Sequence, residues 1–169
     1  MRNLILHRQS GMTLIEVLVS VLILAIGLLG AAAIQLNALK YTDSATLSSQ
    51  ASFIAYDMMD RIRANVDGNA TANGSTDVLA LYNLPAIASA PAGIQANARN
   101  QDLADFRESI ERLPSGTGSV IVKANRYVTI TVGWDDTRAA AASAQASGGT
   151  AQGQNPQKIE ITSRIGVTP

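Results

Sequence analysis

The most apolar part of the chain lies close to its first residue. Residues 12–34 read MTLIEVLVSVLILAIGLLGAAAI, a run of 23 residues in which Glu16 is the only ionisable side chain. About 20 mainly apolar residues are enough for a helix to cross a ~30 Å hydrocarbon layer. The two glycines in the run are tolerated, because glycine is common in membrane helices. The pattern therefore predicts a transmembrane helix over residues 12–34.

A short polar segment precedes this run. It reads MRNLILHRQSG and carries Arg2 and Arg8, so the positive-inside rule places residues 1–11 in the cytoplasm and the remainder of the chain beyond the membrane. A secretory signal would instead be cut at small residues after the apolar region. The alanines at residues 31–33 offer such a site, although no turn residue follows them. Cleavage there is an alternative to a retained helix.

Apolar residues continue at helical spacing after residue 34. Between residues 36 and 62 they recur mostly every three or four positions, which is the spacing of an amphipathic helix. No proline or glycine interrupts residues 31–67, and Gly68 with Asn69 ends the pattern. We expect one helix over residues 12–66, whose second half, residues 35–66, packs against a small domain and keeps its charged side chains on a solvated face.

Residues 67–169 predict a small head that contains both helix and sheet. Residues 67–100 are rich in Asn, Gly, Ala, Ser and Pro and are expected to be mostly irregular. Apolar residues at helical spacing before Pro114 predict a second helix at residues 101–112, capped by Asn100 or Asp102. Alternating segments predict antiparallel strands at residues 119–124, 126–134 and 158–167. Residues 135–157, rich in Ala, Ser, Gly and Gln, are expected to be a flexible loop. The fold class is α+β.

Composition and charge remove several function classes. The chain has 13 basic and 13 acidic side chains, no cysteine and a single histidine, His7. Thiol nucleophiles, zinc–thiolate sites and disulfides are therefore excluded. Asp135 and Asp136 are the nearest carboxylate pair for an enzyme, but adjacent residues on a strand point to opposite faces, and Trp134 beside them is typical of a core. The sequence predicts no enzyme activity, no metal and no cofactor.

The junction between the polar segment and the apolar helix resembles the class III leader of type IV pilins and type II secretion pseudopilins. The residues that carry it are Gly11-Met12-Thr13-Leu14-Ile15-Glu16. The resemblance implies that a prepilin peptidase cuts between Gly11 and Met12 and methylates the new amine of Met12. Glu16 then becomes the fifth residue of the mature chain. A carboxylate in a membrane helix is costly and usually has a partner, and the N-terminal amine of a neighbouring subunit would pair with Glu16 and fix the register of packed helices.

Within that superfamily the sequence is most similar to the minor pilins called type IV pilus modification protein PilV. The similarity covers most of the chain, including SQASFIAYDMMDRIRAN at residues 49–65, DLADFRESIERLPSGTGSV at 102–120 and VTITVGWDD ending at Asp136. It implies the pilin fold, with a long N-terminal helix packed on a small antiparallel sheet. It also implies a role with other minor pilins in priming a pilus and capping its tip, which serves adhesion, twitching motility or DNA uptake.

The resemblance also implies partners and a location. The partners are the prepilin peptidase, other minor pilins, the major pilin and the inner-membrane assembly platform. The location is the inner membrane of a Gram-negative bacterium, with a periplasmic head that reaches the fibre after assembly. Loss of the leader leaves 11 basic and 13 acidic side chains, so direct nucleic-acid binding is not predicted. Two alternatives are a minor pseudopilin of a type II secretion system and an unprocessed membrane protein with a single span.

Overall fold

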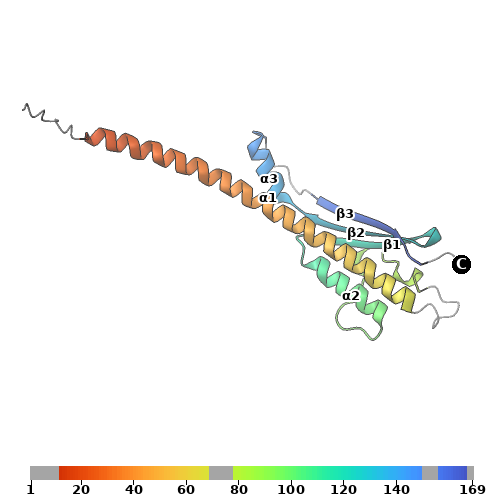
Figure 1. Cartoon of the computed structure of the whole chain (residues 1–169). Helices are drawn as coiled ribbons and strands as arrows, with labels where there is room; N and C mark the ends of the chain where they lie inside the picture. Colours follow the sequence, from red (N-terminus) through yellow and green to blue (C-terminus); the bar gives the residue numbers. More distant parts are fainter. Residues whose placement is uncertain (1–11, 69–77, 150–155, 167–169) are drawn as a thin grey trace, which may run out of the picture. The chain divides into compact units, whose positions relative to one another are not determined.

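The computed structural model describes residues 12–68, 78–149 and 156–166 (Figure 1). The chain divides into two compact units, Met1–Leu39 and Lys40–Pro169, and the boundary between them falls inside the first helix. The elements in chain order are α1 (Leu14–Gly68), η1 (Ala80–Tyr82), η2 (Ile87–Ser89), α2 (Ala98–Glu111), β1 (Thr117–Lys123), η3 (Ala124–Arg126), β2 (Tyr127–Asp135), α3 (Thr137–Ala146) and β3 (Pro156–Arg164). This is the α+β fold, consistent with a pilin, that the sequence predicted.

The three strands form one antiparallel sheet in the order β1-β2-β3. Val120 lies opposite Ile130, and Ile130 lies opposite Ile161. Because side chains alternate between the faces of a strand, this register places most of the apolar residues of the three strands on one face, here called the inner face. The opposite, outer face carries mainly hydroxyl and charged side chains, together with Ile121 and Tyr127.

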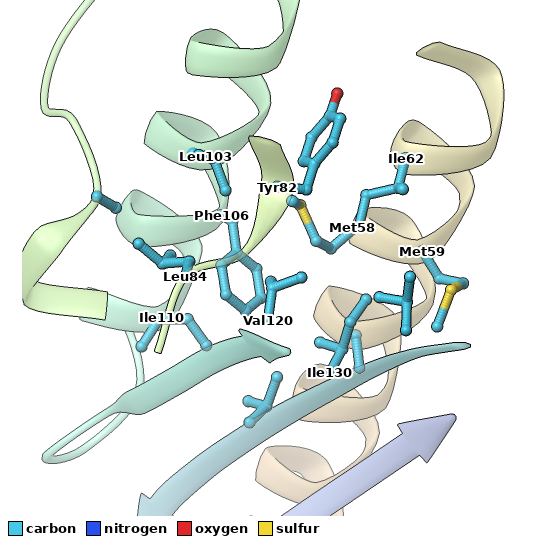
Figure 2. Close-up of a cluster of buried hydrophobic side chains, with 14 of the residues drawn as sticks. Met58, Met59, Ile62, Tyr82, Leu84, Leu103, Phe106, Ile110, Val120 and Ile130 are labelled. Atoms are coloured by element: carbon cyan, nitrogen blue, oxygen red, sulfur yellow. The ribbon is translucent and has the colours of Figure 1, made fainter. Parts of the chain in front are cut away.

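The hydrophobic core of the second unit lies between α1, α2 and the inner face of the sheet. Figure 2 shows side chains from these elements converging on one cluster. Its largest fully buried side chains are Tyr82, Met58, Met59, Ile62, Leu79, Ile110, Ile130, Ile165, Val120, Val128 and Val132. The inward residues of the second part of α1 recur every three or four positions, as the sequence pattern predicted. This spacing holds one face of the helix on the sheet and α2.

Helix α2 begins earlier than the sequence suggested. It starts at Ala98 rather than Gln101, because the side chain of Asn97 accepts a hydrogen bond from the backbone N–H of Asn100 at 2.8 Å. An asparagine in this position satisfies one of the free amides of the first helical turn. The expected caps Asn100 and Asp102 therefore lie inside the helix.

The segment expected to be a flexible loop contains a helix instead. Helix α3, Thr137–Ala146, occupies the first part of residues 135–157, and residues 150–155 lie outside the described part of the chain. The stretch TRAAAASAQA is dominated by alanine, the residue with the highest helix propensity, and the absence of large apolar side chains hid this signal. The strands are also displaced by one to three residues from the expected positions, and α1 by two. The leader, residues 1–11, lies outside the described residues.

Candidate functional site

Thr13 caps the N-terminal end of α1. Its carbonyl oxygen accepts the backbone N–H groups of Glu16 and Val17 at 3.0 and 3.3 Å, and its hydroxyl lies 3.4 Å from the same Glu16 nitrogen. Thr13 and Glu16 thus have the spacing of a capping box, in which a threonine precedes a glutamate by three residues. This role of Thr13 was not predicted, although the Thr-Leu-Ile-Glu motif is present in the sequence. Met12 precedes the helix and is 74% exposed, while Gly11 lies outside the described residues.

The first unit presents an apolar surface with one carboxylate. Every side chain over residues 12–36 is exposed, and a window of this helix has a mean hydropathy of 2.8, with none of it buried. By length and composition the helix can cross a membrane. Among the described residues, no hydrogen bond or ion pair engages the carboxylate of Glu16. The hydrogen bonds at this residue are made by its backbone, whose carbonyl accepts one from Ser20 Oγ at 2.7 Å. An exposed apolar helix of this kind needs lipid or other helices to cover it.

The AYDMMDRIRAN segment, residues 55–65, joins α1 to α2. Its apolar residues enter the core, and Arg61 bridges the two helices. The guanidinium of Arg61 donates to Asp57 one turn earlier and to Asp105 of α2, both at 2.8 Å. Partial burial acts to lower the pKa of Arg61, but the hydrogen bonds and charges of Asp57 and Asp105 outweigh it and raise that pKa. The guanidinium therefore stays charged and holds α2 against α1.

A second polar contact in this region is centred on Tyr82. Its hydroxyl accepts a hydrogen bond from Asn65 of α1 at 2.5 Å and donates one to Asp102 of α2 at 2.6 Å. Burial, and then the carboxylate of Asp102, raise the pKa of Tyr82, and the bond from Asn65 only partly opposes them. Tyr82 therefore joins three elements through a neutral hydroxyl, a role that its isolated position in the sequence did not indicate.

The Trp134-Asp135-Asp136 segment also has a structural use. Trp134 is buried in the core, and its Nε1 is the only buried side-chain nitrogen or oxygen among the described residues that has no hydrogen-bond partner. Asp135 accepts the hydroxyl of Thr137 at 2.6 Å, whereas Asp136 is buried and accepts the hydroxyl of Ser44 from α1. The two carboxylates thus have separate partners. This arrangement ties the end of β2 to α1.

No group of three or more His, Asp or Glu side chains suited to a metal occurs within residues 12–68, 78–149 and 156–166. The features that stand out are instead an exposed apolar helix, one carboxylate near its start and a small α+β head. Together these features fit a membrane-anchored protein of the pilin type.

Comparison with known proteins agrees with this class. A family model described as the prokaryotic N-terminal methylation motif matches residues 6–32, which contain the polar junction, Met12 and Glu16. The match indicates a type IV pilin or pseudopilin-type protein, whose N-terminus is processed by a prepilin peptidase. Neither the search of curated proteins nor the search of solved structures found a match.

Proposed function

We propose that this protein is a minor pilin of a type IV pilus, of the PilV type. In this role it joins other minor pilins on the inner-membrane assembly platform, primes the fibre of major pilin and stays at its tip. Before assembly its head lies in the periplasm of a Gram-negative cell. The role requires an apolar helix that packs with others and a head with specific contact surfaces, and it requires no active site.

The observation that carries the proposal is the position of Glu16. It is the only ionisable side chain in the exposed apolar helix over residues 12–34, and it lies five residues after Gly11 within the matched methylation motif. Cleavage after Gly11 would create a methylated amine at Met12. In a bundle of such helices, the amine of one subunit pairs with the Glu16 carboxylate of the next, because an unpaired carboxylate in an apolar environment is costly.

Two segments of the head support the minor-pilin assignment. The PilV-like residues 55–65 hold α2 on α1 through Arg61, and the Trp-Asp-Asp segment attaches β2 to α1 through Asp136 and Ser44. The PilV-like residues therefore stabilise a head that is built on the second part of α1. A minor pseudopilin of a type II secretion system would use the same leader, so the assays must separate the two.

The first experiment measures the mass of the N-terminal peptide in membranes from cells with and without the prepilin peptidase. We expect a peptide that begins at N-methylated Met12, and only when the peptidase is present. An intact Met1 in both strains would contradict the processing step. Deletion of the gene should then lower the number of surface pili and leave type II secretion unchanged; the opposite pattern would favour the pseudopilin.

The role of Glu16 can be separated from its place in the helix cap. Glu16→Ala should be processed normally but should fail to restore pili in the deletion strain, because the register contact is lost. Thr13→Ala removes the capping hydroxyl and leaves the carboxylate, so it should still restore them. If both variants fail equally, the start of the helix and not the charge is what matters. Normal pilus numbers with Glu16→Ala would refute the register contact.

A further inference from the structure

One end of the outer face of the sheet gathers positive charge around an aromatic ring. In the sheet register, Lys123 of β1 lies opposite Tyr127 of β2, and Tyr127 lies opposite Arg164 of β3. We call these three residues the basic rung. Directly opposed residues have Cβ atoms about 4.5–5.5 Å apart, so the tyrosine lies between two cations. The next rung along this face, Ile121, Thr129 and Thr162, carries no charge.

The basic rung is accessible. Lys123 and Arg164 are exposed, and Tyr127 is 44% exposed. Within the part of the chain that the structure describes, the side chains of these three residues form no hydrogen bond or ion pair. This distinguishes them from Arg61, Arg107 and Arg112, which are each paired with carboxylates. The two cations are therefore available for an external anion.

The β1–β2 turn beside the basic rung is hydrogen-bonded to the end of β3. Asn125 and Arg126 both have left-handed backbone angles, with φ of 59° and 62°, a conformation that is uncommon for a residue such as arginine. The backbone carbonyl of Arg126 accepts the N–H of Ile165 at 3.0 Å, and its Nε donates to the Ile165 carbonyl at 2.8 Å. These two bonds attach the end of β3 to the β1–β2 turn.

We propose that the basic rung binds single-stranded nucleic acid, with one base stacked on Tyr127 and the adjacent phosphates at Lys123 and Arg164. An aromatic ring beside positive charge is the combination by which proteins hold unpaired strands without reading their sequence. The face of the ring takes a base, and the cations take the backbone on either side. A carboxylate ligand would use the two cations and would leave the ring unexplained. The whole-chain charge gave no sign of this site, because it averages residues that only the fold brings together.

The test uses the full chain in a nonionic detergent, which adds no charge, and measures fluorescence anisotropy of labelled oligonucleotides at low salt. The two probes are a twelve-residue thymidine strand and an abasic strand of equal length and charge. Stacking of one base is worth roughly 5- to 150-fold in affinity, so Tyr127→Ala should weaken binding of the thymidine strand at least about 5-fold. The same variant should leave binding of the abasic strand unchanged.

The charged residues give a second readout. For a single strand, each neutralised phosphate contributes about 0.7 to the slope of log affinity against log salt. Lys123→Ala and Arg164→Ala should each lower the slope by about that amount. Lys158→Ala is the matched control: Lys158 is exposed on the same strand and face as Arg164, six residues or about 20 Å away, and its loss should leave the slope unchanged. Unaltered emission from Trp134 verifies that each variant is folded.

Several outcomes would overturn the proposal. These are equal binding of the two strands by the wild type, an equal effect of Lys158→Ala and Lys123→Ala, and no binding at low salt. Dextran sulfate provides a further arm, because it is a polyanion without bases. If it binds as tightly as the thymidine strand and depends equally on Tyr127, the site takes a polysaccharide and not a nucleic acid. None of these results depends on the proposed role as a minor pilin.

Discussion

Replacement of Ile62 by alanine tests whether the second part of α1 is held by its core contacts. Ile62 is fully buried between α1, α2 and the sheet. The substitution removes three buried carbon groups, each worth about 0.8 kcal/mol, and the cavity left behind brings the usual total to about 2–5 kcal/mol. Alanine returns a few tenths of a kcal/mol through its higher helix propensity. We expect the free energy of unfolding of the head to fall by about 3 kcal/mol.

The chain contains its own probe for this measurement. Trp134 is the only tryptophan, and it is buried in the same core as Ile62. Its emission during urea unfolding of the full chain in nonionic detergent therefore reports on the head and not on the apolar helix. With a urea dependence near 2 kcal/mol per M, a loss of about 3 kcal/mol lowers the midpoint by about 1.5 M.

Ile94 supplies the matched control, because it is 97% exposed. Ile94→Ala makes the same chemical change where no packing is lost, and it should alter the free energy of unfolding by less than about 0.5 kcal/mol. Ile62→Val should lie between the two, at a loss of about 1 kcal/mol. Equal effects of Ile62→Ala and Ile94→Ala would refute the assignment of Ile62 to the core.

Three further predictions follow from polar contacts and close approaches. Burial raises the pKa of Tyr82 above its unfolded value of about 10, so the stability that the neutral hydroxyl contributes is complete below pH 10 and is lost above it, by up to about 1.4 kcal/mol per pH unit. Tyr82→Phe should lack this loss when urea unfolding is measured from pH 9 to 11. The same pH profile in the wild type and in Tyr82→Phe would contradict the prediction. Ser44→Ala removes the hydroxyl that Asp136 accepts and should cost about 1–3 kcal/mol in the same assay, whereas no cost would mean that water replaces it freely. A Cβ at Gly133 would lie 2.5 Å from Thr117 Oγ1, so Gly133→Ala should lower the melting temperature and Thr117→Ala should restore part of it; absence of rescue would locate the strain elsewhere.

The junction at residues 11–16 and the apolar run were visible in the sequence because both are local signals. A membrane-spanning helix needs only length and composition, and the processing motif is a short run of neighbouring residues. The core face of α1 was predictable for a similar reason, since 3.6-residue periodicity fixes which side chains share a face. Helix α3 was not foreseen, because an alanine-rich segment has high helix propensity but lacks the large apolar residues by whose spacing the other helices were recognised.

The sequence by itself determined that the chain has an apolar N-terminal helix with one carboxylate, that this helix continues as an amphipathic helix, and that the strands have one solvent-exposed face. Those features depend on composition and on period within one element. Only the tertiary structure decided that Arg61 meets Asp105, that Ser44 meets Asp136 and that Lys123, Tyr127 and Arg164 form one rung. The physical reason is that such contacts join residues up to 92 positions apart. Strand register and helix packing, which bring them together, are set by the core as a whole and not by any local pattern.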